Sequence, residues 1–421
     1  MENENRTMNG WRLLQTAANE LSLATTLKCG QSFRWKASGE NEWSIALRNR
    51  IISLRQTAPA APIHYRAIHP PSSSPPLVPP LDDTEELLHD YLALSVNLEN
   101  LYAQWTRDDQ VFAKLAPRFA GIRILRQPPL ENLLSFICST NNNIARITQM
   151  VDKLCVNYGT YIGDLDGVAY YDFPTLETFA EAAARTGEDD LETKLRGMGF
   201  GYRAKYIAKT ALILAHDHPP NWLEDLRTKT YQEAHESLLT LSGVGPKVAD
   251  CVCLMSLDQH SAVPVDTHVF QIAVRDYKFR SKGAGKGTGT MNKATCEAVG
   301  EFFRTLWGPY AGWAQSVVFT ADLRAFADHG REESVTVKEE VVVTVKQEVI
   351  KREDNDERVM VEKDVNVKVK VEDVFREVKE EAVEGPVFVE GKRRSRRVIE
   401  RVKVKRVKRE DDDGSENRLE Q

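Results

Sequence analysis

The sequence predicts an α+β protein in which an antiparallel sheet domain precedes a helical domain and a charged tail. Short β-rich runs occupy residues 10–56, and apolar residues recur at helical spacing from Asp83 to about Phe326. Of the 91 residues from 331 to 421, 48 are charged. These patterns are typical of strands, helices and disorder respectively. We therefore expect a sheet domain over residues 10–82, a helical domain over 83–327 and a disordered tail over 328–421.

The sheet domain is predicted from tryptophans and from short aliphatic runs. Trp11, Trp35 and Trp43 lie among such runs, and Ile45-Ala-Leu and Ile51-Ile-Ser-Leu alternate or cluster as strand residues do. Residues 58–80 contain eight prolines and a Ser-Ser-Ser run. This composition indicates an irregular insert outside the core.

The helical domain is predicted element by element from helix starts and stops. Thr84-Glu-Glu-Leu-Leu and Pro128-Pro-Leu-Glu open two helices, and a third, with apolar residues at helical spacing, ends at Gly159. Arg203 begins a further helix after a glycine-rich turn, and Trp313 begins the last. Residues 283–290 are glycine-rich but lack the arrangement of a phosphate loop, so they predict a surface loop.

A tight turn between two helices is predicted around Gly243 and Gly245. Both glycines lie between two apolar helical patterns, and Pro246 suits the first position of the second helix because proline lacks an N–H. The free N–H groups and the dipole at such a helix start can hold a phosphate. Lys247 lies on this first turn, and Asp266, 19 residues later, is the predicted N-cap of a helix from Thr267 to about Arg275.

Two segments of this region carry a family resemblance. Leu-x-Gly-Val-Gly-x-Lys-Val-Ala-Asp, from Leu241 to Asp250, and Val-Pro-Val-Asp-x-His, ending at His268, resemble the helix-hairpin-helix DNA glycosylases. The 8-oxoguanine DNA glycosylase/AP lyases are the most similar branch, and Gly-Gln-Ser-Phe-Arg-Trp, from Gly30, resembles them too. The resemblance covers roughly residues 10–326. It implies a base-excision repair enzyme that extrudes and excises 8-oxoguanine opposite cytosine in duplex DNA and then cuts the abasic site by β-elimination.

Lys247 and Asp266 would carry this chemistry. A lysine amine can attack C1′ and form a Schiff base with the opened sugar, provided that the amine is neutral. A helix N-terminus disfavours the ammonium form, which suits Lys247. Asp266 would stay ionised, stabilise positive charge developing on the sugar and orient Lys247. Without the resemblance, Asp266 would be interpreted as a helix cap, and capping is compatible with catalysis. Asp250 is a second carboxylate near Lys247, and we expect it to support its helix.

The resemblance also assigns a base pocket and a DNA-binding surface. The Gly30 carbonyl would accept the N7–H that only the lesion carries, although Gly30 alone is typical of a turn or bulge. Phe319 and Cys251 would stack on the base, Gln315 would read its Watson–Crick edge and Met255 would line the pocket; without the resemblance, Phe319, Met255 and Cys251 are ordinary core residues. The implied DNA contacts are Asn141, Arg146, Tyr202 and Arg203 at the vacated stack and the opposite cytosine, Gly243 and Gly245 in the hairpin, and His268 at a phosphate.

The resemblance implies no cofactor for catalysis, but it implies a structural cation. The backbone carbonyls of Leu239, Leu241 and Val244 would bind this cation and bridge it to the DNA.

The composition restricts how the protein can bind DNA and where in the cell it can work. The net charge is −6, and residues 331–421 hold 23 Lys and Arg against 25 Asp and Glu, so the remaining residues carry −4. DNA affinity must therefore come from local patches and helix N-termini. No apolar run is long enough to cross a membrane, and six cysteines without Cys-x-x-Cys spacing predict a reduced intracellular protein. We expect a monomer.

The tail contains two kinds of short motif. The basic clusters that begin at Lys392 and Arg401 suit nuclear import or a sliding DNA contact, and a solvated charge run is the alternative. An aliphatic residue, Lys, any residue and Glu recur, which resembles the acceptor motif of the small ubiquitin-like modifier. The lysines concerned are Lys338, Lys346, Lys351, Lys370, Lys379 and Lys408. We expect a nuclear protein that interacts with downstream base-excision repair proteins.

Two other functions remain open from the sequence. One is a monofunctional glycosylase for another damaged base, but such relatives lack the lysine that Lys247 provides. The other is a non-catalytic helix-hairpin-helix module that binds DNA and recruits partners through a modified tail. Borohydride trapping on lesion-containing duplex separates the lyase from both of these alternatives, because only a lysine Schiff base is reduced to a covalent complex.

Overall fold

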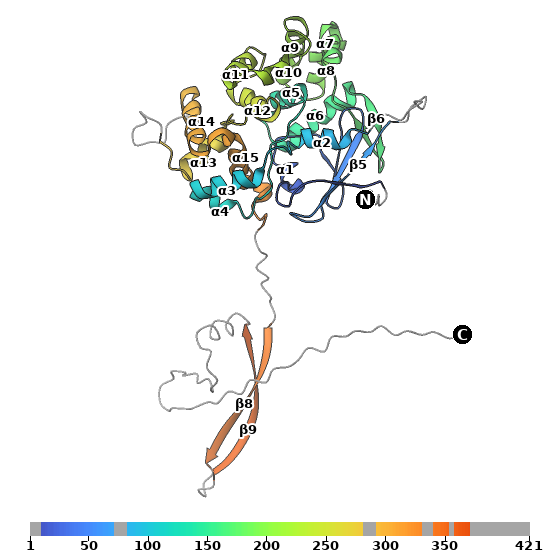
Figure 1. Cartoon of the computed structure of the whole chain (residues 1–421). Coiled ribbons are helices and arrows are strands. Elements are labelled where there is room, and N and C mark those ends of the chain that lie inside the picture. The colour runs from blue at the N-terminus through green and yellow to red at the C-terminus, as the bar shows by residue number, and fades with distance from the viewer. Residues whose placement is uncertain (1–9, 71–81, 281–291, 331–339, 353–357, 371–421) are drawn as a thin grey trace, which may run out of the picture. The chain divides into compact units, whose positions relative to one another are not determined.

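The computed structural model describes residues 10–70, 82–280, 292–330, 340–352 and 358–370 (Figure 1). The chain divides into two units, Met1–Arg331 and Glu332–Gln421. The α+β class expected from the sequence is confirmed: an antiparallel sheet comes first and a helical region follows. Residues 283–290 and both basic clusters of the tail lie outside the described residues, and so do Lys338, Lys379 and Lys408.

The N-terminal sheet has five antiparallel strands in the order β1-β5-β4-β3-β2. Their bounds are β1 Arg12–Leu14, β2 Lys36–Gly39, β3 Glu42–Ala46, β4 Ile51–Arg55 and β5 Ile63–Ile68. In the β3–β4 ladder Trp43 pairs with Leu54 and Ile45 with Ile52, and all four side chains are buried. They form one apolar cluster with Leu87 and Leu88 of α2, so the sheet is covered by the start of the helical region.

Strand β5 corrects the expectation of an irregular insert over residues 58–80. It pairs with both β1 and β4, which makes it a central strand, and Ile63 and Tyr65 are each 1% exposed. The alternation of Ile63-His-Tyr-Arg-Ala-Ile has the period of two that a strand requires. The prolines lie before and after this run, where they do not interrupt the ladder. Residues 71–81 of the insert lie outside the described residues.

The helices begin and end close to the expected positions. Their bounds are α1 Leu23–Thr26, α2 Thr84–Tyr91, α3 Leu98–Asp108, α4 Gln110–Leu115, α5 Pro129–Ser139, α6 Ile144–Tyr158, α7 Leu176–Ala184, α8 Leu191–Gly197, α9 Arg203–His216, α10 Trp222–Asp225, α11 Tyr231–Leu239, α12 Pro246–Ser256, α13 Thr267–Arg275, α14 Lys293–Trp307 and α15 Ala311–Asp322. Short 3-10 turns occupy Gly187–Asp189, Leu226–Thr228, Gly308–Tyr310 and Arg324–Phe326. Local capping explains several starts: the Asn143 side chain accepts from the N–H of Arg146, and Thr230 and Glu233 form a capping box.

A β-hairpin interrupts the helical region, which the sequence analysis did not anticipate. Strands β6 Tyr161–Leu165 and β7 Val168–Tyr171 pair antiparallel directly after α6. Ile162 and Tyr170 bury against Ile51 of β4 in a small separate cluster. The hairpin therefore joins the helical region to the sheet.

Helices α5 and α12 lie centrally in the larger unit. In Figure 1 the sheet and the β6–β7 hairpin lie on one side of these helices, and α13, α14, α15, α3 and α4 lie on the other. Val252, Leu254, Leu133 and Ile137 on the two central helices are fully or almost fully buried. This arrangement fixes the start of α12, where Lys247 lies, between the two sides.

The second unit contains one described element, an antiparallel ladder of β8 Glu340–Arg352 and β9 Arg358–Lys370. It coincides with the Val-Lys runs, whose alternation has strand periodicity. No helix within the described residues is long and apolar enough to cross a membrane.

Candidate active site

The hairpin between α11 and α12 has the geometry that its glycines predict at one position. Gly243 has φ +79°, in the left-handed region that glycine alone adopts without strain, whereas Gly245 is extended with φ −102°. Pro246 occupies the first position of α12. Lys247 follows on the first turn, where the N–H groups of the helix start are free of intrahelical partners.

Lys247 lies over an aromatic ring and has no carboxylate partner. Its Nζ is 4.9 Å from the ring centroid of Phe136, a buried residue of α5. Among the residues that the structure describes, no carboxylate lies within ion-pair distance of Nζ. The amine therefore has an aromatic face on one side and no fixed counter-charge among the described residues.

Asp266 caps α13 as expected. Its Oδ1 accepts hydrogen bonds from the backbone N–H groups of His268 at 3.0 Å and Val269 at 3.1 Å. No direct hydrogen bond between Asp266 and Lys247 exists within the described part of the chain. Its expected influence on Lys247 would thus act through space or through a bound substrate, and it remains a prediction.

One pocket, of about 60 Å³, contains both of these residues and all five of those expected to hold the base. Gly30, Lys247, Cys251, Met255, Asp266, Gln315 and Phe319 all line it. They come from three segments far apart in the chain: the loop before β2, the α12–α13 region, and α15. Folding therefore brings together the residues that the resemblance singled out one by one.

Gly30 is a turn glycine at the rim of this pocket. Its φ is +86°, and a Cβ built on it would lie 3.0 Å from Cδ1 of Ile144. The added atom would thus meet Ile144, at the start of α6. Gln31 holds the loop in place: its amide donates to the Arg123 carbonyl at 2.8 Å and accepts from the Leu125 N–H at 2.9 Å.

Burial keeps the two thiols near the pocket in their neutral form. Burial raises the pKa of Cys251 to about 12, against the opposing influence of Lys247, and burial raises that of Cys29 to about 11. All six cysteines are free, as a reduced protein would have them. Cys251 therefore contributes an apolar, polarisable surface to the pocket.

Three of the four residues expected at the opposite strand, Asn141, Tyr202 and Arg203, are joined by hydrogen bonds. The Tyr202 hydroxyl and the Arg203 guanidinium both donate to the carbonyl of Thr140, and Arg203 also donates to that of Asn141 at 3.0 Å. Arg146 donates to the Gly199 carbonyl at 3.2 Å. Arg203 is 4% exposed, and its buried Nε has no hydrogen-bond partner among the described residues.

His268 lies at the edge of the pocket. Its ring is 6.2 Å from that of Phe319, and its Nδ1 is 3.8 Å from Oδ2 of Asp322 at the end of α15. Asp322 is also 2.8 Å from Arg275. Sequence reasoning missed Asp322, because nothing in the local pattern of α15 relates it to α13.

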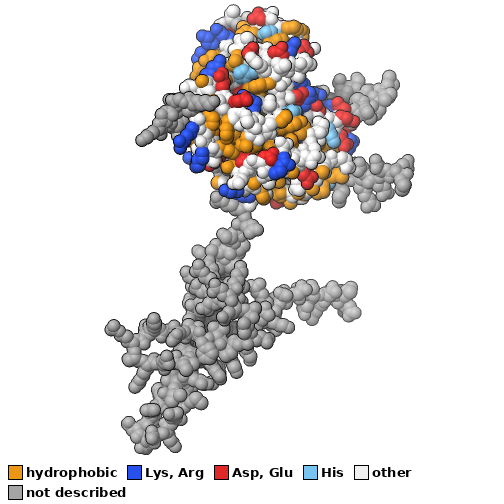
Figure 2. All heavy atoms as spheres, turned by 60° about the vertical axis from the view of Figure 1, so that its left-hand side comes forward, with side chains coloured by type: hydrophobic (Ala, Val, Ile, Leu, Met, Phe, Trp, Pro, Cys, Tyr) orange, Lys and Arg blue, Asp and Glu red, His pale blue; other side chains and the backbone are white. Residues whose placement is uncertain are grey.

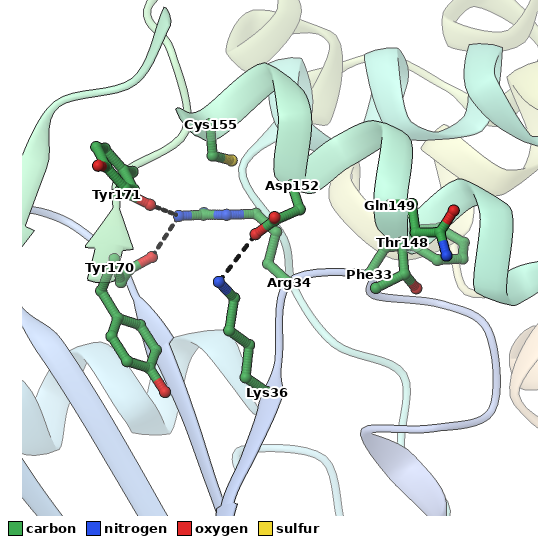
Figure 3. Close-up of a pocket in the computed structure, with 10 residues that line it drawn as sticks. Phe33, Arg34, Lys36, Thr148, Gln149, Asp152, Cys155, Tyr170 and Tyr171 are labelled. Carbon is green, nitrogen blue, oxygen red and sulfur yellow. Dashed lines mark hydrogen bonds and ion pairs between the residues drawn. The ribbon is translucent and has the colours of Figure 1, made fainter. Parts of the chain in front are cut away.

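A second and larger cavity, of about 180 Å³, lies between the sheet, α6 and β7 (Figure 3). Arg34 crosses it and is fully paired: it donates to Glu131 at 2.6 Å, to the Ala46 carbonyl at 2.6 Å and to the Tyr171 carbonyl at 2.9 Å. Lys36 pairs with Asp152 at 2.9 Å. Arg34 belongs to the Gly-Gln-Ser-Phe-Arg-Trp segment. The sequence analysis did not single it out, because composition does not show that this arginine is buried.

Charged side chains of both signs are interspersed on the face that Figure 2 shows. No broad field of one sign appears there, which agrees with the net charge. Contacts to DNA phosphates would therefore depend on local N–H groups and individual side chains.

Family models match most of the larger unit. The N-terminal domain of 8-oxoguanine DNA glycosylase matches residues 13–133, and the HhH-GPD superfamily of base excision DNA repair proteins matches residues 134–295.

Individual proteins are similar over most of their length. The chain is 41% identical over 317 residues to the N-glycosylase/DNA lyase OGG1 of Arabidopsis thaliana, which covers 75% of this chain and 81% of that protein. It is 39% identical over 332 residues to the N-glycosylase/DNA lyase of Saccharomyces cerevisiae, with 72% and 84% covered. Among solved structures, the Clostridium acetobutylicum 8-oxoguanine glycosylase/lyase, in complex with duplex DNA that contains cytosine opposite 8-oxoguanine, has a TM-score of 0.60 at 25% identity, with 74% of this chain and 94% of that chain covered.

Proposed function

The chain belongs to the family of 8-oxoguanine DNA N-glycosylase/lyases, and from this premise we propose that it excises 8-oxoguanine paired with cytosine through a Schiff base on Lys247. The observation that carries the proposal is the shared pocket of Gly30, Lys247, Asp266 and the α15 residues. The amine over Phe136 lacks an ion pair within the described chain, which suits a nucleophile.

The chemistry follows from these positions. The Lys247 lone pair attacks C1′ while the bond from C1′ to the base breaks, and the base leaves after gaining a proton. Opening of the sugar ring gives an imine between Nζ and C1′. This imine acidifies C2′, so loss of a C2′ proton expels the 3′ phosphate and cuts the strand. Asp266, held by its cap hydrogen bonds, stabilises the positive charge on the sugar in the first step.

The preference for cytosine rests on the group around α9. The Tyr202 hydroxyl and the Arg203 guanidinium meet at the Thr140 carbonyl, and Arg203 also donates to the carbonyl of Asn141. Cytosine presents acceptors at O2 and N3 once its partner is extruded, and an arginine can donate to both. The solved relative that contains cytosine opposite 8-oxoguanine supports the same pairing here.

Borohydride trapping tests the proposal directly. The protein should form a covalent complex with duplex containing 8-oxoguanine opposite cytosine, and excise the base faster there than opposite adenine in single-turnover reactions. Excision without any trapped complex would favour a monofunctional glycosylase. Binding without excision would favour a non-catalytic module.

The hairpin carbonyls also suit a structural cation. Leu239, Leu241 and Val244 surround the left-handed turn at Gly243, and their neutral oxygens are the donors that a hard cation prefers. The Leu241 carbonyl accepts the Val244 N–H at 3.3 Å, which leaves one of its lone pairs free. A cation there would add positive charge at a DNA phosphate. Affinity for duplex should then be higher in potassium than in tetramethylammonium at equal ionic strength.

We further infer a nuclear location from the basic clusters that begin at Lys392 and Arg401, and modification of tail lysines by a small ubiquitin-like protein. Removal of residues 331–421 leaves every pocket residue in place, so excision in vitro should change by no more than a few-fold. The truncated protein, fused to a partner too large to diffuse, should lose nuclear accumulation. A fully nuclear truncated fusion would refute the import role.

A further inference from the structure

Helix α9 connects the opposite-strand group to the hairpin that precedes Lys247. Its first turn carries Tyr202 and Arg203. One turn later, the ring of Tyr206 lies 5.8 Å from that of Tyr202, at an interplanar angle of 72°. Tyr206 is half-buried, and its hydroxyl makes no hydrogen bond within the described residues, so the ring is the part of this side chain that makes contacts.

The ring of Tyr206 lies directly against the backbone of Gly243. A Cβ built on Gly243 would be 2.5 Å from Cγ of Tyr206 and 2.6 Å from its Cβ and Cδ2. One turn farther along α9, the buried hydroxyl of Thr210 donates to the Ser242 carbonyl at 2.9 Å. Two successive turns of α9 therefore hold the two residues at the tip of the hairpin.

The hairpin tip is in turn continuous with the start of α12. The Val244 N–H donates to the Leu241 carbonyl, and the Ala249 N–H donates to that of Gly245 at 2.9 Å. Lys247 is only four residues after Gly243. A displacement of the tip thus changes the position from which the amine approaches a bound sugar.

We propose that Tyr206 is a specificity-determining positioning residue, whose ring transmits the fit of the opposite base at Tyr202 and Arg203 to the Gly243 turn and so to Lys247. This inference rests on the proposed cytosine preference and adds how that preference reaches the chemistry. A base that fits poorly displaces the start of α9, and a closely packed ring passes the displacement on instead of absorbing it. Misplacement of a reacting group by about 1 Å can lower a rate by about 100-fold.

The test compares Tyr206→Leu with Tyr206→Phe. Single-turnover excision is measured opposite cytosine and opposite adenine, with the active fraction counted by borohydride trapping at an abasic site. The leucine variant fills space without a flat ring, so its cytosine-to-adenine rate ratio should fall by about 3- to 30-fold relative to the unaltered protein. The phenylalanine variant keeps the ring and should keep the ratio.

A purely structural role for Tyr206 would lower both rates together and leave their ratio unchanged, which would overturn the inference. If the unaltered protein itself showed no preference for cytosine, the proposed function would fail and the inference with it. A preference that persists in full in Tyr206→Leu would overturn the inference alone.

A double-substitution cycle tests the contact itself. Gly243→Ala places a methyl group against the ring, so it should slow excision strongly in the unaltered protein. In a Tyr206→Ala background the clash is absent, and the same change should slow excision several-fold less, with the remaining loss due to the positive φ. Equal losses in both backgrounds would show that the two residues act independently and would overturn the inference.

Discussion

Two lysines of the larger unit lie in similar surroundings but differ in their partners. Lys36, in the cavity beside the sheet, has its Nζ 5.4 Å from the ring centroid of Tyr170, and Lys247 lies 4.9 Å from that of Phe136. Lys36 is paired with Asp152 at 2.9 Å, whereas Lys247 has no ion pair among the described residues. In the larger cavity both cationic side chains are paired, Arg34 with Glu131 and Lys36 with Asp152. Lys247, the proposed nucleophile, thus differs from Lys36 in lacking a fixed counter-charge rather than in having more space around it.

The largest expected effect follows from exchanging each lysine for glutamine. Lys247→Gln should abolish covalent trapping and slow base release by about 1,000-fold or more, because no other amine of the described residues lines the pocket. Lys36→Gln, the matched control, should trap and excise within a few-fold of the unaltered protein. Both variants are measured by single-turnover excision and borohydride trapping. Undiminished trapping in Lys247→Gln would show that another amine is the nucleophile and that Lys247 does not differ from Lys36 in function.

A second contrast concerns the aspartate near each lysine. Asp152 is exposed, but Asp250, one turn after Lys247, is 8% exposed and accepts from the Tyr231 hydroxyl at 2.6 Å. His235 is 3.5 Å from the same oxygen, and Arg304 lies over the Tyr231 ring. Burial raises the pKa of Asp250 to about 7, and the hydrogen bond from Tyr231 and the charge of Arg304 lower it by less.

The raised pKa of Asp250 fixes the sign of its effect on stability. The folded chain keeps the proton up to about pH 7, whereas the unfolded chain loses it near pH 4. The stabilising contribution is therefore complete below pH 4 and is lost as the pH rises to 7. Asp250→Asn cannot ionise, so between pH 4.5 and 8 it should lose roughly 3 kcal/mol less unfolding free energy than the unaltered protein.

Urea unfolding at several pH values measures this difference. Asp152→Asn, at the exposed pair, should change the unfolding free energy by less than about 1 kcal/mol at any pH. Parallel curves for Asp250→Asn and the unaltered protein would mean that Asp250 is ionised normally in the folded chain.

The smallest of the three effects concerns a glycine beside each cavity. Gly30→Ala introduces strain at φ +86° and a contact of 3.0 Å with Ile144, which should displace the carbonyl that we expect to face the lesion. Loss of that hydrogen bond should slow excision of 8-oxoguanine by about 10- to 100-fold, but cleavage of an abasic site by no more than a few-fold. Gly163→Ala is the control, because a Cβ there meets only Ile51 at 3.6 Å.

Relief of the steric contact sharpens the Gly30 experiment. Ile144→Ala combined with Gly30→Ala should recover part of the excision rate if the contact with α6 contributes to the loss. Equal loss on lesion and abasic substrates in Gly30→Ala would show that Gly30 is only a turn residue.

Local sequence predicted those parts of the molecule that local chemistry decides. The hairpin followed from Gly243 and Pro246, and the start of α13 followed from the cap at Asp266. Strand β5 was missed because prolines on either side of Ile63–Ile68 dominated the composition.

Tertiary contacts decided what the sequence could not predict. The tyrosine that lies on Gly243 is 37 residues away, and the helix that a Gly30 side chain would meet begins at Ile144. Neither of these two contacts produces a periodic pattern or a capping residue by which the sequence would reveal it. The family resemblance predicted which residues would meet in the pocket, but not that Lys247 would lie over Phe136 or that Arg34 would be fully paired.

The span of the pocket along the chain has a consequence for biosynthesis. Its first lining residue, Cys29, and its last, Thr320, are separated by most of the larger unit. At about 5–20 residues per second, a ribosome needs roughly 15–60 s between Gly30 and Phe319. Throughout that interval the nascent chain already has Gly30 and later Lys247, but it lacks the α15 wall against which a base would be held. An enzyme whose product is a cut DNA strand is thus inert until nearly all of its folded part has been made.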